Sequence, residues 1–108
     1  MRRDEGMAFT RYRKPWVVEL KKCQNGLSAG SIVAYDPNAD LYVPWTPDKD
    51  VAGVLLEDVP AGSGGMYAQV LLEGHIEVEK LSIVPDEDIK HALAKKGIYV
   101  IEKEDVEG

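Results

Sequence analysis

Short apolar runs separated by turn residues make up the chain between residues 26 and 81. The gaps between the runs are rich in glycine, proline, aspartate and asparagine, which favour tight turns. This pattern of hydrophobic and polar positions is typical of a small β-rich domain. It predicts strands over residues 16–20, 31–35, 41–43, 51–56, 66–74 and 75–79.

Turn residues also predict how some of these strands connect. The segment from Lys21 to Gly26 is expected to turn the chain. The Asp, Pro and Asn residues between Asp36 and Asp40 predict a hairpin that pairs residues 31–35 with residues 41–43.

Two prolines flank Trp45 and limit what this segment can do. Pro44 and Pro47 cannot donate a ladder hydrogen bond, so the segment is expected to leave the sheet or to run along its edge. Trp45 is then either a lid on the core or an exposed contact. The lid is the commoner arrangement, because a buried tryptophan contributes a large apolar area.

The apolar pattern also predicts which side chains face the core. The nearly continuous apolar run over residues 51–56 indicates a strand that is covered on both faces. Gly74 allows a kink or a bulge in the strand that follows. The inward-facing set beyond the glycine loop is predicted to be Met66, Ala68, Val70, Leu72, Ile76 and Val78.

One short helix is predicted near the C-terminus. It begins at residues 85–88, where acidic side chains suit the positive end of the helix dipole, and it ends before Gly97, a residue suited to the left-handed position after a helix. A closing strand is expected over residues 98–101, and residues 102–108 are expected to be an acidic tail with no reason to pack. The predicted buried face of the helix consists of Ile89, Ala92 and Leu93.

Length and composition indicate one ordinary globular domain. The chain has 108 residues, which favours a single domain. Its one cysteine, Cys23, cannot form an internal disulfide, so a Cys23→Ser variant is expected to keep its folding and binding. No apolar stretch approaches 18 residues, and no apolar region follows the basic start of the chain, so neither a membrane span nor a secretory signal is expected.

The net charge of −6 is divided unevenly along the chain. Residues 1–22 hold seven basic and three acidic groups, a net charge of +4, while the other 86 residues hold six basic and sixteen acidic groups, a net charge of −10. The pattern indicates a basic arm on an acidic body. Nucleic acid is not expected as a partner, because phosphates would repel such a body.

Residues 1–15 form the predicted arm. They contain two aromatic residues, Phe9 and Tyr12, but no helical or alternating apolar pattern, so the arm is expected to be flexible when alone. It is either a plain disordered tail or a tail that orders against a partner, with the two aromatic residues as anchors.

No arrangement of residues predicts catalysis. His75, His91 and Cys23 lie in different predicted elements and do not match a zinc spacing. The acidic residues 86–88 could hold a cation, but the helix N-terminus already accounts for them. The glycine-rich loop 61–65 leads into a strand rather than a helix, unlike a phosphate loop. We therefore predict no enzyme activity, no cofactor and no metal.

Five segments follow one another along the chain in a characteristic order and spacing. They are Phe9-Thr10-Arg11-Tyr12, Gly26-Leu27-Ser28-Ala29, Leu41-x-Val43-x-Trp45, Val51-Ala52-Gly53-Val54-Leu55 and Ala94-x-x-Gly97-Ile98. This order and spacing resemble the head decoration proteins of lambda-type tailed phages over about residues 8–101. The arm here is more basic than in that family, Pro15 lies one place later, and the tail beyond Ile101 is extra.

This resemblance implies a compact, β-rich α+β fold of the β-barrel-like, β-tulip type, with one short helix and a flexible arm. Composition and pattern divide the chain into the arm at residues 1–15, one decoration-protein domain at residues 16–101 and the acidic tail at residues 102–108. The resemblance further implies a homotrimer, made in the host cytoplasm, that stabilises the outer surface of an expanded capsid. The arm would pair as an added strand with the major capsid protein through Phe9, Thr10, Arg11, Tyr12, Arg13 and Pro15.

Two other classes of function fit the residues. One is a β-barrel module of another virion part, such as a tail or baseplate. The other is a cytosolic protein-binding module whose basic arm meets an acidic partner. In all three readings the partner is a protein, and neither a membrane nor a nucleic acid is expected.

Overall fold

The computed structural model describes residues 16–62 and 64–102. Most of the regular structure in these residues is β-strand, as the apolar pattern predicted. The elements in chain order are β1 (Val17–Cys23), β2 (Ile32–Asp36), β3 (Leu41–Pro44), β4 (Gly53–Leu55), β5 (Met66–Glu77), the 3-10 helix η1 (Val78–Lys80), α2 (Glu87–Lys96) and β6 (Ile98–Ile101).

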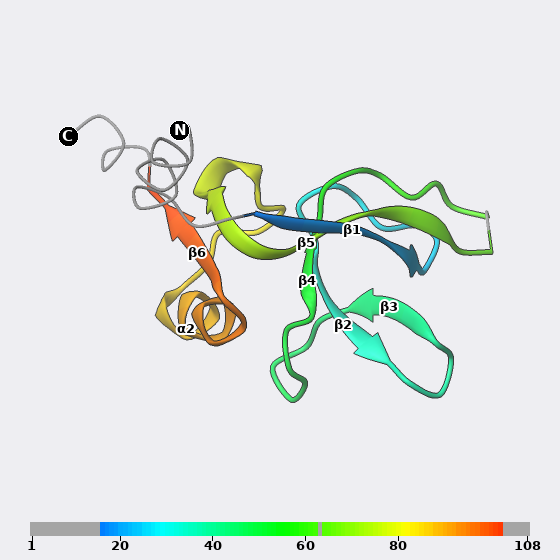
Figure 1. Ribbon diagram of the computed structural model, residues 1–108, viewed down its shortest axis with the longest axis horizontal. Helices are drawn as coiled ribbons and strands as arrows, with labels where there is room; N and C mark the ends of the chain where they lie inside the picture. The colour runs from blue at the N-terminus through cyan, green and yellow to red at the C-terminus, as the bar shows by residue number, and fades with distance from the viewer. Residues whose placement is uncertain (1–15, 63, 103–108) are drawn as a thin grey trace, which may run out of the picture.

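The strands form one sheet that closes on itself. Its order is β1-β3-β2-β4-β5-β6, and β1 also pairs with β5, so five strands make a ring and β6 extends from β5. Antiparallel pairing joins β1 to β5 from Val17↔Glu73 to Cys23↔Met66. Figure 1 shows α2 and β6 at one end of the molecule and the β2–β3 hairpin toward the other. The predicted compact, strand-rich class with a helix near the C-terminus is confirmed.

Opposite faces of the central strands enter two separate hydrophobic clusters. Val54 of β4 and Leu71 of β5 belong to one cluster, and their neighbours Leu55 and Val70 belong to the other. The first cluster also contains Leu93 of α2, which is fully buried. Burial of each such side chain stabilises the fold by about 1.5–3 kcal/mol. The split explains why the apolar run around β4 is covered on both faces, as predicted.

β1 extends three residues beyond its predicted end at Leu20. Lys21 and Lys22, which were expected in a turn, remain paired with β5, and Cys23 at the end of the strand is fully buried. The prediction was wrong because a charged side chain does not prevent its backbone from joining a ladder. Lys21 also finds a local partner, since its Nζ lies 3.0 Å from Oε1 of Glu19.

β5 joins two predicted strands into one that is bent at Gly74. This glycine has φ of 135°, and a Cβ added to it would lie 3.2 Å from the indole ring of Trp16. Both the backbone angle and the close approach therefore require glycine at the predicted kink. Ala68 and Val70 are buried and Leu72 is half-buried, as predicted, but Met66 at the open end of the strand is 42% exposed.

The predicted alternation ends two residues earlier than expected. Ile76 is buried as predicted, but β5 ends at Glu77, and Val78 is a half-buried residue of η1 rather than an inward-facing strand residue. The chain turns here because its backbone is held elsewhere: the Ser82 N–H donates to the Gly30 carbonyl at 3.0 Å. Alternation of residue types alone does not reveal such a contact.

The predicted hairpin is confirmed, with β2 and β3 paired from Asp36↔Leu41 to Val33↔Pro44. The chain leaves the sheet after Pro44. Trp45 is half-buried and packs against the first hydrophobic cluster, while its indole N–H donates to the Lys49 carbonyl at 2.7 Å. Trp45 is therefore a lid on the core, the commoner of the two arrangements considered.

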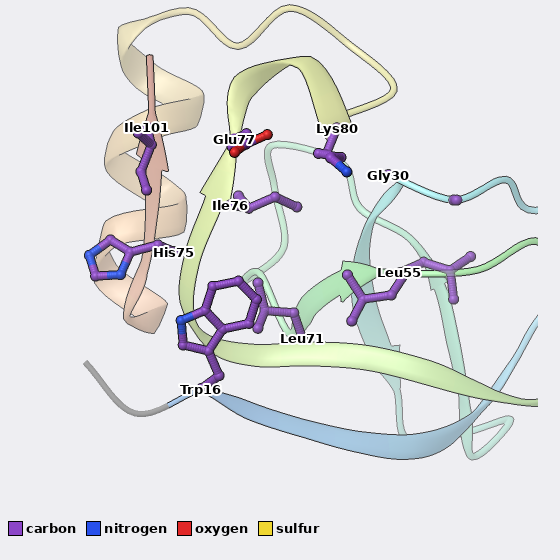
Figure 2. A pocket seen from close by; sticks show the side chains of 11 residues that line it. Trp16, Gly30, Leu55, Leu71, His75, Ile76, Glu77, Lys80 and Ile101 are labelled. Atoms are coloured by element: carbon purple, nitrogen blue, oxygen red, sulfur yellow. The ribbon is translucent and has the colours of Figure 1, made fainter. Parts of the chain in front are cut away.

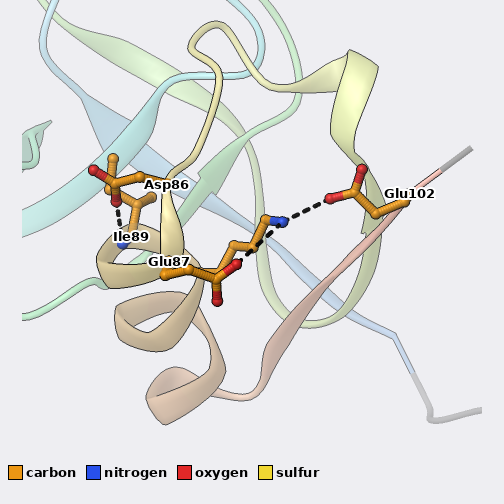
Figure 3. A network of polar contacts seen from close by, with 5 residues as sticks. Asp86, Glu87, Ile89 and Glu102 are labelled. Carbon is orange, nitrogen blue, oxygen red and sulfur yellow. Dashed lines mark hydrogen bonds and ion pairs between the residues drawn. The ribbon is translucent and has the colours of Figure 1, made fainter.

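The helix has the predicted ends. The Asp86 side chain accepts a hydrogen bond from the Ile89 N–H at 2.9 Å, and Gly97 adopts φ of 102° at the C-terminal end (Figure 3). Such caps satisfy backbone groups that a helix leaves unpaired. Ile89 and Ala92 pack beside the buried Leu93, so the predicted apolar face is also confirmed.

Glu102 departs from the expectation that nothing beyond β6 packs. Its carboxylate lies 2.7 Å from Nζ of Lys90 on α2, and both side chains are about one-third exposed (Figure 3). β6 places Glu102 beside the helix, a proximity that the sequence pattern does not disclose. A partly exposed pair of this kind contributes about 0–1 kcal/mol. Residues 103–108 of the predicted tail lie outside the described residues.

Candidate functional site

The predicted capsid-binding arm lies outside the described residues. Its joining point is described, because Trp16 immediately precedes β1 and its side chain is 58% exposed. The candidate site is therefore built from the surface on which the arm begins. The arm residues that fall outside the description are Phe9, Thr10, Arg11, Tyr12, Arg13 and Pro15.

A hollow of about 390 Å³ lies beside Trp16. It is hereafter called the Trp16 hollow. Figure 2 shows Trp16, Leu71 and Ile76 projecting into it, while His75 projects to the other side of β5. The walls are mainly apolar, and the charged residues Glu77 and Lys80 lie at one end. The space lies beside the bend of β5 at Gly74, where residues 75–77 turn away from the closed ring of five strands.

A second exposed apolar feature lies on the paired strands β1 and β5. It is hereafter called the outer face, and it comprises Val18, Leu20, Lys22, Tyr67 and Gln69. Leu20 is 61% exposed and Tyr67 is 65% exposed. Leu20 pairs with Gln69 and Lys22 pairs with Tyr67, so the two large apolar side chains are diagonal neighbours on one face. Together these two side chains place apolar area on the surface of the paired strands.

Charged groups along β1 lie between these two surfaces. The Lys21 ammonium lies 3.0 Å from the Glu19 carboxylate and 5.9 Å from the centre of the Tyr42 ring. The hydrogen bond to Glu19, with a smaller contribution from Tyr42, raises the pKa of Lys21. Lys21 therefore stays charged at neutral pH. Glu19 and Lys21 lie on one face of β1, and Val18 and Leu20 lie on the opposite face.

The residue types that most often perform catalysis are dispersed in the structure. Burial raises the pKa of the Cys23 thiol and Glu57 raises it further, so the thiol is a poor nucleophile. His75 packs its ring against Tyr99 with centroids 5.8 Å apart, and His91 lies on the exposed side of α2. No arrangement of a nucleophile and a base emerges from these positions, and the absence of enzyme activity stays a prediction.

The acidic residues at the start of α2 act as helix-terminal groups. Asp86 is the N-cap, and Glu87 lies 4.0 Å from Lys90. Within residues 16–62 and 64–102, no group of three or more histidine, cysteine or acidic side chains could hold a metal ion. In the same part of the chain, no helix is long and apolar enough to cross a membrane.

Comparison with known proteins adds no family assignment: neither a family model nor a curated protein matches this chain.

Sequence reasoning missed both the Trp16 hollow and the outer face. The outer face had a sequence signal, because Val18 and Leu20 alternate with Glu19 and Lys21, and the predicted inward set of β5 leaves Tyr67 and Gln69 for the other side. The hollow had no such signal. Its lining comes from Trp16 before β1, from the loop at residues 29–30, and from β4, β5, η1 and β6, and it lies beside the bend of β5 at Gly74.

Proposed function

We propose that this protein decorates the outside of an expanded icosahedral capsid as a homotrimer and stabilises the shell against the pressure of packed DNA. Its N-terminal arm adds a strand to the major capsid protein. The observation that carries this proposal is the ordered set of motifs from Phe9 to Ile98 that resembles the lambda-type decoration proteins. The ring of strands with one C-terminal helix supports it, because the resemblance implies a small β-barrel-like domain of the β-tulip type.

The position of the arm supports attachment by strand addition. Residues 1–15 lead directly into β1 through an exposed Trp16, so the arm starts at the surface of the domain. In strand addition, main-chain hydrogen bonds supply affinity and alternate side chains select the site. Phe9 and Tyr12 serve as the apolar anchors, and the basic residues steer the arm toward an acidic partner.

The free-energy cost of ordering the arm favours a trimer over a single chain for attachment to the capsid. Ordering about seven arm residues costs on the order of 7–14 kcal/mol. Strand pairing and burial of two aromatic side chains exceed this cost only modestly, so a single arm binds weakly. Three arms on one rigid body gain roughly 10²–10⁴ in avidity. The exposed outer face offers apolar area for contact between copies or with the shell.

Removal of residues 1–15 is expected to abolish most binding to expanded capsids while leaving the domain folded. Residues 1–15 hold little core-forming material, whereas the buried hydrophobic residues of the described chain run from Cys23 to Ile98. Tyr12→Ala is expected to weaken binding by a few kcal/mol per arm, whereas Arg13→Ala costs about 0–1 kcal/mol and mainly slows association at low salt. Occupancy of purified capsids lacking this protein, imaged across a salt series, measures these effects.

Full capsid occupancy by the truncated protein would contradict attachment through the arm. Failure of the intact protein to bind capsids, together with binding to a tail component or to a cytosolic acidic protein, would favour one of the two other classes. Arg13→Ala is the matched control for Tyr12→Ala, because both variants shorten a long side chain in the same segment.

A further inference from the structure

The Trp16 hollow lies at the point from which the arm departs. Trp16 forms one wall, and the residue before it is the last residue of the arm. A Cβ at Gly74 would lie 3.2 Å from the indole ring, so one side of the ring packs closely over the β5 backbone while Trp16 remains 58% exposed. A segment that leaves Trp16 therefore starts at the mouth of a preformed apolar space.

The lining of the hollow selects an aromatic side chain with a polar tip. The exposed Trp16 and the half-buried Ile101 supply accessible apolar surface beside the buried Leu55, Leu71 and Ile76, whereas Glu77 and Lys80 place charge at one end. A tyrosine suits such a space, since its ring is apolar and its hydroxyl needs a polar partner or water.

Chain length distinguishes between the two aromatic residues of the arm. Tyr12 lies four residues before Trp16, and four extended residues span at most about 14 Å. Phe9 lies seven residues away and lacks a hydroxyl.

We propose that Tyr12 packs into the Trp16 hollow of its own chain when the protein is free. Only about three residues must be ordered for this contact, because Pro15 has a fixed φ and one side of the Trp16 ring already packs over β5. The cost of ordering them is close to the gain from burying one tyrosine against a tryptophan, so the contact forms and opens readily. If the proposed function holds, Tyr12 exchanges this internal site for the major capsid protein, and the internal contact lowers the rate of attachment.

Nuclear magnetic resonance of the isolated full-length protein tests the contact without capsids. Tyr12→Ala is expected to shift the Trp16 indole signal and to remove cross-peaks between the Tyr12 ring and the Ile76 methyl groups. The Trp45 indole is an internal control, because it is held by its hydrogen bond to Lys49 on another part of the fold. Phe9→Ala is the matched arm variant and is expected to leave the Trp16 signal in place. An unchanged Trp16 signal in Tyr12→Ala, or an equal change in Phe9→Ala, would overturn the proposal.

A disulfide test separates the chain's own arm from that of another copy. In a Cys23→Ala background, the pair Arg13→Cys and Lys80→Cys keeps Tyr12 and is expected to oxidise within one chain several-fold faster than the same pair with Tyr12→Ala added. Equal rates would show random collision of a tail, and covalently linked dimers would show that another copy fills the hollow. Either result overturns the proposal. Neither test involves the capsid, so a failure of capsid binding would bear on the proposed function alone.

Discussion

At the scale of single residues, Cys23 illustrates how a side chain without chemical partners still matters for the fold. Its side chain is fully buried in the second hydrophobic cluster, and its Sγ lies 3.3 Å from the Lys21 carbonyl. The sequence offered no reason to give this lone thiol a role. The structure shows a role in packing.

Cys23→Ser is expected to destabilise the protein by about 1 kcal/mol at neutral pH. A serine hydroxyl replaces an apolar thiol in the core, but it can still donate to the Lys21 carbonyl, so the cost falls at the low end of the range for a buried polar group. Urea unfolding of the variant and of the natural protein measures the difference. Intact folding with this small loss would agree with the expectation that the variant keeps its fold, and a loss of several kcal/mol would contradict the retained hydrogen bond.

The same thiol should also make stability depend on alkaline pH. Its folded-state pKa is raised by burial, so its contribution is full below the unfolded pKa of about 8.5 and is lost as pH rises through the folded-state pKa. Cys23→Ala lacks this titration and is the control. A difference in stability between the two proteins that stays constant from pH 7 to pH 10 would contradict the burial of an ionisable thiol.

At the scale of elements, the stability of the helix α2 comes from its two capping residues and from its packing, because the helix itself is short. It has ten residues, which is too short for stable helix formation in isolation. The Asp86 cap, the C-terminal Gly97 and the packing of Leu93 therefore hold it in place.

Asp86→Ala is expected to cost about 0.5–2 kcal/mol of stability, because the Ile89 N–H loses its acceptor. Asp88→Ala is the matched control. It removes a charge from the same first turn without removing the cap, and it is expected to cost no more than about 0.3–1 kcal/mol. Thermal unfolding measures both variants, and equal losses would show that charge rather than capping matters at this end.

The elements also show how far the sequence pattern reaches. Strong local signals placed the β2–β3 hairpin and both ends of α2, because turn and cap residues act on their immediate neighbours. The extra length of β1 and the end of β5 were missed, because they are decided by pairing across the sheet and by the contact between Gly30 and Ser82. The Trp16 hollow was missed for the same reason. The arm was identified as a candidate site from its composition and from the family resemblance, and its residues lie outside the described part of the chain.

At the scale of the whole molecule, the ring of strands leaves the apolar side chains of the outer face exposed. Leu20 and Tyr67 are the most exposed large apolar residues on the outer face. A small domain that keeps such a surface uncovered is expected to associate.

We expect light scattering at micromolar concentration to give a trimer, three times the chain mass of 11.9 kDa, or a monomer that becomes trimeric only on the capsid. Leu20→Lys is expected to shift a trimer toward monomer, since it places a charge on the outer face. Val84→Lys is the matched control, because Val84 is 91% exposed but lies in the segment before α2. A stable dimer or hexamer would count against the trimer, and an unaffected trimer in Leu20→Lys would place the interface elsewhere.

The antiparallel pairing of β1 with β5 has a mechanical consequence for an arm that continues from β1. Tension applied through residue 16 acts along the strand, so the seven cross-strand pairs from Val17 to Cys23 are loaded together in shear. A strand pulled at right angles would instead lose its pairs one after another. Resistance to such a load depends on the rate of unfolding rather than on equilibrium stability. If the arm binds a capsid shell as proposed, a shell that swells and pulls on the arm would load all seven β1–β5 pairs at once. These pairs would then separate together rather than one by one.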